Sequence, residues 1–207
     1  MSSLASFIPF LFLLLAAMTV HEFAHGWVAF KLGDNTAKSL GRLTLNPIAH
    51  IDPFGTIILP MLVFFASQGQ FIFGAAKPVP INYLALKNPK RDMIWIGLSG
   101  PAANILFAII LRLIWSSFPI PFNLIGIFKI LITINVVLGV FNLLPIPPLD
   151  GSRVLMGLLP RGLARNYAKI EPFGFFIIML LFVMGLFQAV VLPIVVLILN
   201  SLGVYSF

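Results

Sequence analysis

The sequence contains no cysteine, which excludes disulfide bonds and thiolate metal ligands. Charge is also scarce, because Asp, Glu, Lys and Arg together make up 9% of the 207 residues and only six of them are acidic. So few charges cannot cover the surface of a soluble domain, whereas 60% hydrophobic residues and a mean hydropathy of +1.07 are typical of an integral membrane protein. Because the chain has no thiolates, any metal ion must be held by His, Asp, Glu or water.

Polar stretches longer than a loop are absent too, so we expect one integral membrane domain over residues 1–207 with an all-α polytopic fold. The apolar runs predict membrane spans at residues 4–30, 93–117, 124–144, 171–187 and 189–204, while residues 54–76 are either re-entrant or spanning. The last two runs are one bent or two separate C-terminal helices. A cleavable signal peptide is the alternative for the first run, which is too long and lacks a basic start.

The formal net charge of +7 would suit a nucleic-acid-binding protein, but the Lys and Arg residues fall mainly in three short loops beside apolar runs. This is the positive-inside pattern of cytosolic loops, so we expect the lipid bilayer, and no nucleic acid, as a partner. If the loops at residues 31–42 and 77–91 share that face, residues 54–76 must cross an even number of times. This favours a re-entrant segment, followed by a short extended segment at residues 77–83.

Three ionisable side chains interrupt the first apolar run, namely His21, Glu22 and His25. On a helix the two histidines lie one turn apart on one face, as in the His-Glu-x-x-His pattern with which metalloproteases bind Zn²⁺. In that chemistry Glu22 is the general base that accepts a proton from water. The alternative is a set of hydrogen bonds between helices without a metal, but burying three ionisable groups in hydrocarbon usually marks function. His25 precedes Lys31 by about 9 Å of helix, which predicts a site near the cytosolic face.

A third ligand is expected where the run at residues 124–144 ends, because Pro145, Pro147 and Pro148 there precede Asp150. Closely spaced prolines leave unwound backbone, which a membrane tolerates only where it lines a polar cavity. The loop charges put this end on the same face as His25, so Asp150 is the favoured ligand. The alternative is an ordinary Asp-Gly turn before an amphipathic helix.

The remaining histidine, His50, lies in the turn-rich stretch from Gly41 to Asp52. Three interpretations of His50 stay open: a metal ligand, an outer partner that orients a ligand, or an anchor that holds the loop at the lipid headgroups. Asp52 is likewise a candidate outer partner of the site.

Three stretches, His21-Glu22-Phe23-Ala24-His25, Ser99 to Asn104 and Asn142 to Gly151, fall on three successive apolar runs. Together they resemble the motifs of the site-2 protease family of intramembrane zinc metalloproteases, although small residues such as those from Ser99 to Asn104 usually indicate close helix packing. The resemblance implies a three-helix catalytic core around one Zn²⁺ per chain, bound by His21, His25 and Asp150. It further implies that Asn142 steadies the substrate or the oxyanion, unless its amide joins two helices.

The activity implied by this resemblance is hydrolysis of a peptide bond in or near a transmembrane segment of a protein substrate, at a prokaryotic plasma membrane. A helical substrate must unwind before it reacts, and pairing with an extended segment of the enzyme would compensate its freed backbone groups. Val79 and Ile81 form the candidate substrate strand. Many members of this family carry a soluble regulatory domain that this chain lacks, so a separate regulatory protein is a candidate partner.

Two other functions compete with this interpretation. A membrane metalloprotease acting on a prenylated C-terminus would want a glutamate as third ligand, and Glu171, the only other glutamate, lies in a poor context. A membrane metal-ion transporter could use the same His, Glu and Asp cluster along an ion path. The behaviour of a Glu22→Gln variant separates the protease from the transporter.

Overall fold

The computed structural model describes residues 4–66, 68 and 74–205, and every regular element among them is helical, which confirms the all-α prediction. The three longest helices are α1 (Leu4–Lys31), α4 (Pro89–Ser117) and α5 (Phe122–Asn142), followed in length by α8 (Gly174–Val183) and α9 (Leu192–Ser201). The shorter elements are α2 (Thr36–Ser39), η1 (Pro47–His50), η2 (Pro53–Ile58), α3 (Leu59–Ala66), η3 (Tyr83–Ala85), α6 (Asp150–Leu158), α7 (Arg161–Ala168), η4 (Glu171–Phe173) and η5 (Phe187–Val191).

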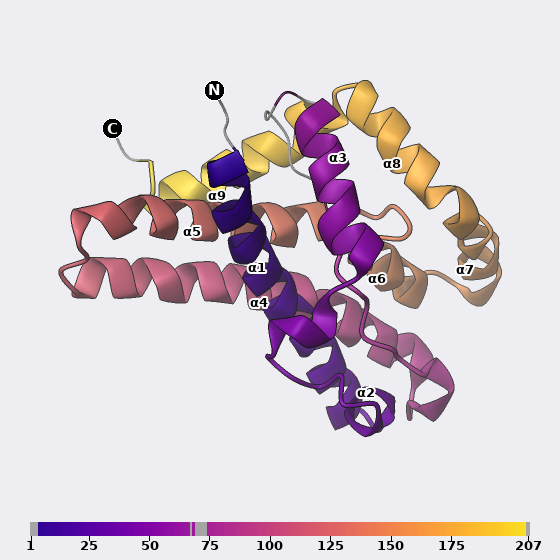
Figure 1. Cartoon of the computed structure of the whole chain (residues 1–207). Coiled ribbons are helices and arrows are strands. Elements are labelled where there is room, and N and C mark those ends of the chain that lie inside the picture. Colours follow the sequence, from indigo (N-terminus) through magenta and orange to yellow (C-terminus); the bar gives the residue numbers. More distant parts are fainter. Residues whose placement is uncertain (1–3, 67, 69–73, 206–207) are drawn as a thin grey trace.

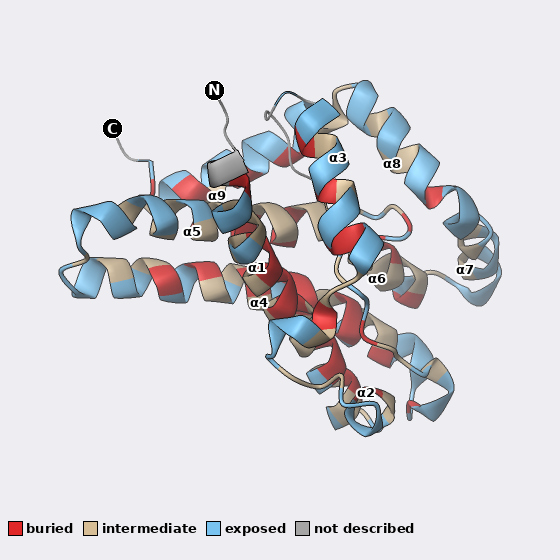
Figure 2. Ribbon diagram, viewed as in Figure 1, coloured by how far each residue is buried: buried red, intermediate tan, exposed pale blue. Residues whose placement is uncertain are grey.

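Helices α4 and α5 form an antiparallel hairpin, and α1 crosses it obliquely (Figure 1). The buried residues gather where these three helices meet (Figure 2). Small residues allow the close approach: a Cβ at Gly139 of α5 would lie 3.0 Å from the Ile105 side chain and 3.1 Å from the Pro101 carbonyl oxygen of α4. The predicted three-helix core is therefore present, with α1 packed across the α4–α5 hairpin.

Among the described residues, four helical stretches are long and apolar enough to cross a membrane: Phe7–Lys31, Pro89–Ser117, Phe122–Asn142 and Arg161–Val183. The C-terminal region is divided differently from the expected 171–187 and 189–204, because α8 ends at Val183 and the chain turns at Gly185, whose φ of 82° suits only glycine. The following helical stretch, Phe187–Ser201, is about 22 Å long, short of the roughly 30 Å of hydrocarbon. It packs along α5 through Val191, Val195 and Leu199.

The two ends of the segment 54–76 lie together. The segment begins at η2, where the Asp52 carboxylate accepts a hydrogen bond from Gly55 N at 2.6 Å, and continues into α3. The chain comes back beside its start, because Ala75 N donates to the Gly55 carbonyl at 2.9 Å. Residues 67 and 69–73, in the middle of this predicted re-entrant or spanning segment, lie outside the described residues.

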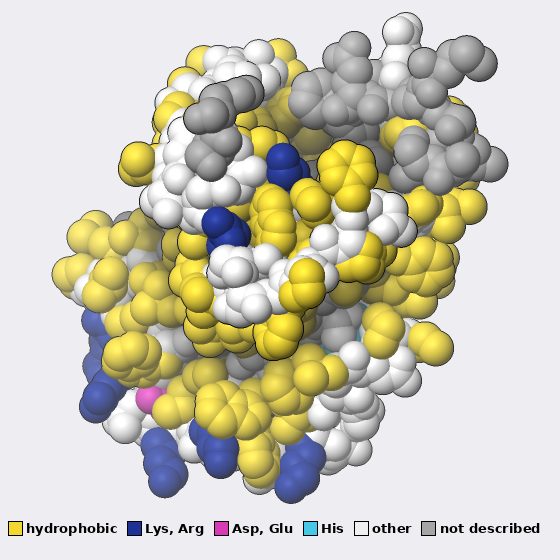
Figure 3. Space-filling model, turned by 90° about the vertical axis from the view of Figure 1, so that its left-hand side faces the viewer, with side chains coloured by type: hydrophobic (Ala, Val, Ile, Leu, Met, Phe, Trp, Pro, Cys, Tyr) yellow, Lys and Arg dark blue, Asp and Glu magenta, His cyan; other side chains and the backbone are white. Residues whose placement is uncertain are grey.

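Hydrophobic side chains cover much of the described part of the face in Figure 3, and lysine and arginine side chains gather along its lower edge. Several cations are held against aromatic rings: Lys31 lies 5.5 Å from the Trp27 ring and Lys38 lies 4.6 Å from the Phe30 ring. Both pairs belong to the end of α1 and the loop after it. The first basic loop of the sequence is thus folded against the end of the helix that carries His21 and His25.

Candidate metal centre

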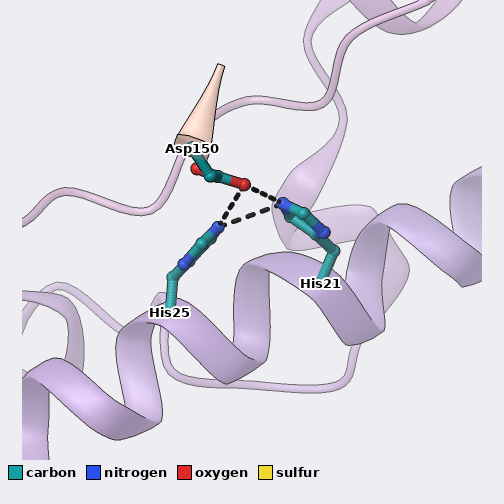
Figure 4. A group of neighbouring side chains, drawn as sticks. All are labelled: His21, His25 and Asp150. Carbon is teal, nitrogen blue, oxygen red and sulfur yellow. Dashed lines mark hydrogen bonds and ion pairs between the residues drawn. The ribbon is translucent and has the colours of Figure 1, made fainter. Parts of the chain in front are cut away.

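His21, His25 and Asp150 point toward one another from two helices (Figure 4). The histidines lie one turn apart on α1, and Asp150 is the first residue of α6. Asp150 Oδ2 lies 2.9 Å from His21 Nε2 and 3.2 Å from His25 Nε2, and the two Nε2 atoms are 3.0 Å apart. Within the described residues these three side chains are the group that meets the spacing of a metal site.

The route by which Asp150 reaches the histidines starts where α5 ends at Asn142, eight residues earlier. The prolines that follow cannot continue the helix, and the chain turns back so that α6 packs on α4. Gly151 permits this turn because a Cβ there would overlap the Leu143 carbonyl. Gly97 permits the contact with α4, where a Cβ would lie 3.0 Å from the Asp150 carbonyl oxygen.

The outer nitrogen of each histidine is held by a hydrogen-bond acceptor. His21 Nδ1 lies 2.6 Å from Asn104 Oδ1, and His25 Nδ1 lies 2.7 Å from the Ile96 carbonyl oxygen, with Ser99 Oγ 3.2 Å away. Because a carbonyl oxygen can only accept, each ring donates its Nδ1–H to its outer partner, and both Nε2 atoms face the centre of the group, where a deprotonated Nε2 can bind a metal. Fixing the ring in this way is what the outer partners of zinc-binding histidines do.

Asn104 is itself held in place by further hydrogen bonds. Its Nδ2 donates to the Ala17 carbonyl at 3.0 Å and to Asn135 Oδ1 at 2.8 Å, and Asn104 and Asn135 are both fully buried. Sequence reasoning missed these roles, since it treated the stretch from Ser99 to Asn104 as packing and did not consider Asn135. The available signal was that an amide inside an apolar helix must find partners.

Asn104→Ala is expected to weaken zinc binding about 10- to 100-fold, as loss of an outer partner of a ligating histidine does. The physical reason is that His21 loses the acceptor that fixes its tautomer. Competition with a metal chelator on the purified protein measures this affinity. Asn123→Ala, at an exposed asparagine near the start of α5, is the control and should leave the affinity unchanged. Equal affinities in both variants would contradict the proposed role of Asn104.

The geometry fits a zinc ion. Ligands about 2.0–2.1 Å from a tetrahedral zinc lie about 3.3 Å from one another, close to the separations between the three donor atoms here. Gly100 of α4 leaves the space beside them free, because a Cβ at this position would overlap both Nε2 atoms. Two imidazoles and one carboxylate are also the donor types of a catalytic zinc site with an open fourth position.

Glu22 lies outside the group of three donors, on the neighbouring side of α1. Its Oε2 accepts a hydrogen bond of 2.7 Å from Val79 N, which belongs to the extended chain before η3. The absence of a side chain at Gly26 lets this stretch lie close to α1, because a Cβ at this position would be 3.0 Å from Val79 Cγ1. The segment that contains Val79 and Ile81 is irregular, with no strand assigned among the described residues.

The other predicted residues lie further from the three donors. His50 is fully buried, with Nε2 2.9 Å from the Thr44 carbonyl oxygen and Nδ1 without a hydrogen-bond partner in the described part of the chain. Asp52 caps η2, and Asn142 Nδ2 donates to the Leu138 carbonyl at 3.0 Å. Across the described residues, no hydrogen bond joins His50, Asp52 or Asn142 to a ligand side chain, so their contributions to the site stay predictions.

The sequence profile of Peptidase family M50 matches residues 9–121 and 120–186. A relative from Bacillus subtilis (strain 168), named "Putative zinc metalloprotease YwhC", is 39% identical over 198 residues, which are 91% of this chain and 86% of the relative. "Putative zinc metalloprotease Rip2" of Mycolicibacterium smegmatis is 32% identical over 172 residues, 82% of this chain and 64% of the relative.

A more distant relative, "Zinc metalloprotease MJ0392" of Methanocaldococcus jannaschii, is 27% identical over 72% of this chain and 34% of its own length. No solved structure matches. The matched region contains all three donor residues, and the relatives are named for zinc and for proteolysis. The chain therefore belongs to peptidase family M50, the site-2 protease family of zinc metalloproteases.

Proposed function

We propose that this metalloprotease hydrolyses a peptide bond in or beside a transmembrane segment of a membrane-protein substrate, near the cytosolic face of a prokaryotic plasma membrane. The observation that carries the proposal is the position of the donor group: His21 and His25 lie on α1, which packs against two other helices long enough to span a bilayer, and Asp150 meets them there. A transmembrane helix in the same bilayer would approach such a site laterally. His25 lies about 9 Å along α1 from Lys31, where the basic loop begins.

The test of this proposal is cleavage in proteoliposomes. The purified protein should cut a model substrate with one transmembrane helix, and mass spectrometry should map the cut to the apolar stretch or its border. The matched control is the same substrate with its apolar stretch replaced by a soluble linker of equal length. Cleavage of the soluble control at the same rate would contradict the assignment of the substrate class.

In the proposed mechanism, His21, His25 and Asp150 hold one Zn²⁺ per chain. Bound there, the ion supplies Lewis acidity, which lowers the pKa of a water molecule and polarises the scissile carbonyl. The part of Glu22 is to accept the proton of that water and to pass it to the leaving amine. Its Oε2 is occupied by Val79 N, whereas Oε1 makes no hydrogen bond within the described residues and is available for the proton.

Asn142 is proposed to donate its amide to the oxyanion or to a substrate carbonyl. One N–H of this amide donates to the Leu138 carbonyl within α5, and the second N–H has no partner among the described residues and is available to the substrate. Asn142 is the last residue of α5, eight residues before Asp150. In this proposal the unwound substrate lies beside the end of α5. An Asn142→Ala protein with an unchanged kcat would remove this residue from the mechanism.

Val79 and Ile81 are proposed to offer backbone groups to the unwound substrate. The Val79 carbonyl and the N–H and carbonyl of Ile81 have no hydrogen-bond partner in the described part of the chain, although their neighbours Lys77 and Asn82 do. A substrate strand can therefore pair at this point and satisfy its own freed groups. Pro78 and Pro80 lack an N–H, which leaves Ile81 as the donor of this stretch.

Ile81→Pro is expected to lower kcat/KM about tenfold, the effect of one lost hydrogen bond whose partner is left unsatisfied. Zinc content should not change, because Ile81 does not contact the donors. The Ile81→Ala variant keeps the N–H, so its kcat/KM should fall much less. Steady-state kinetics with the transmembrane substrate provides the measurement, and equal losses in the two variants would show that the Ile81 side chain, not its N–H, matters.

The segment 54–76 is proposed to be re-entrant, because its two ends are joined by the hydrogen bond between Ala75 and Gly55. A cysteine introduced at Gln68 reports on this directly, since the chain has no other cysteine. In cells, an impermeant thiol reagent added from outside should fail to label this position. Labelling from the external side alone would show a complete crossing and would contradict the proposal.

A further inference from the structure

Several hydrogen bonds join the residues from Gly41 to Thr56 with the stretch 75–79. Thr56 Oγ1 donates to the Ala75 carbonyl at 2.9 Å, and Lys77 N donates to the His50 carbonyl at 3.0 Å. One step further, Val79 N donates to Glu22. The residues from Gly41 to Thr56 thus hold the stretch 75–79 in a fixed position relative to α1.

Arg42 contacts the stretch 75–79 through its side chain. Its Nη2 donates to the Lys77 carbonyl at 2.8 Å and to the Pro78 carbonyl at 3.3 Å. These carbonyls come directly before the Val79 N–H that binds Glu22. A guanidinium is suited to hold two acceptors at once, and hydrogen bonds from a charged donor are about twice as strong as neutral ones.

The far end of the same stretch is held independently. Asn82 N donates to Asp34 Oδ2 at 2.7 Å, and Asp34 is almost completely buried. Burial opposes ionisation of Asp34, but the hydrogen bonds from Thr36 and from Asn82 N outweigh it and hold the pKa of this carboxyl below its usual value. Arg42 and Asp34 therefore fix both ends of the stretch 77–82, and the unpaired groups of Val79 and Ile81 lie between them.

We propose that Arg42 is a positioning residue for proteolysis: by holding the carbonyls of Lys77 and Pro78 it fixes the Val79 N–H that orients Glu22, and it sets the register of the free edge at Val79 and Ile81. This inference rests on the proposed function, because it assigns Glu22 and that edge to the cleavage reaction. It gives the stretch from Gly41 to Thr56 a role that does not require the imidazole of His50, whose carbonyl makes the contact.

The first test is hydrogen–deuterium exchange of the full chain in detergent. Arg42→Ala should accelerate exchange of the Lys77 and Val79 amides on the order of tenfold, because two charge-assisted bonds are lost. The control is Lys38→Ala, which removes a cation of the same loop that contacts the Phe30 ring and has no hydrogen bond to the stretch 75–79. Unchanged exchange in Arg42→Ala would overturn the inference even if the protein proves to be no protease.

The second test is kinetic. Arg42→Ala should lower kcat for the transmembrane substrate roughly 10- to 100-fold with zinc content unchanged, since displacement of a catalytic group by about 1 Å has effects of this size. Arg42→Lys, which can reach one carbonyl, should recover part of the loss, and Lys38→Ala should retain full activity. If Arg42→Ala does not fold, Arg42→Gln takes its place in both tests, because glutamine is uncharged but can still donate to a carbonyl.

The outcomes separate the two proposals. If the wild-type protein cuts the substrate and Arg42→Ala cuts it at the same kcat, Arg42 has no positioning role. If zinc is lost from Arg42→Ala and from Arg42→Gln together with activity, the role of Arg42 is to hold the fold. If the wild-type protein cuts nothing while exchange rises as expected, the proposed function fails but the contact of Arg42 with the stretch 77–79 stands.

Discussion

Glu22→Gln is expected to bind zinc normally and to lose cleavage by about 10²- to 10⁴-fold in kcat, the range contributed by a positioned general base. Glutamine has nearly the shape of glutamate, and its amide oxygen can still accept the hydrogen bond from Val79 N. It cannot accept a proton from water at neutral pH. Because Glu22 is outside the group of three donors, the metal should stay in place.

Two measurements on the same sample decide this prediction. Zinc content by atomic absorption should equal that of the wild-type protein, and kcat for the transmembrane substrate should fall by about 10²- to 10⁴-fold. Wild-type kcat in the variant would eliminate Glu22 as the base. Loss of zinc together with activity would instead make Glu22 part of the metal-binding group, contrary to the geometry described above.

Gly100→Ala is expected to abolish both zinc binding and cleavage. The added methyl group would occupy the space beside both Nε2 atoms, where it would overlap His21 and His25. The helix itself should tolerate the change, since alanine is favoured over glycine within helices by about 1 kcal/mol. The loss would therefore come from the site and not from a weakened α4.

Gly126→Ala is the matched control, because a Cβ at this position of α5 meets no atom within 4 Å. It should keep zinc and activity, and by helix propensity it should be slightly more stable. Helical content by circular dichroism should be the same in both variants. If Gly100→Ala retained zinc at wild-type affinity, the donor atoms could not be arranged as they are here, and the proposed ligand set would need revision.

The grouping of His21, His25 and Asp150 could be predicted from the sequence because each residue has a strong local signal. His21 and His25 are four residues apart in an apolar helix, and Asp150 follows three prolines that end one. The helical core was predictable for the same reason, since hydropathy over some twenty residues is a robust indicator of membrane helices. The family assignment confirms the zinc metalloprotease class that the motifs indicated.

The supporting contacts could not be predicted, because they join residues far apart in the chain. The partners Asn104 and His21 are separated by 83 positions, and Val79 and Glu22 by 57. Asn104 stands among small residues that look like helix packing, and the hydrogen-bonding group of Val79 is its backbone N–H, which side-chain patterns do not reveal. Similarly, the end of α8 depends on the left-handed conformation of Gly185, which a single glycine in an apolar run does not specify.

We propose that this protein needs a zinc ion, held by His21, His25 and Asp150, to cut a transmembrane segment. The test is cleavage of the transmembrane substrate by the wild-type protein in liposomes. Cleavage is measured before zinc removal, after removal with a chelator and after zinc is restored. Zinc flux across the liposome membrane is followed in parallel. We predict one zinc ion per chain, a cut in or beside the apolar stretch that disappears with the metal and returns with it, and no flux. Movement of zinc across the liposome with no cut at any zinc concentration would contradict the claim and identify a metal-ion transporter.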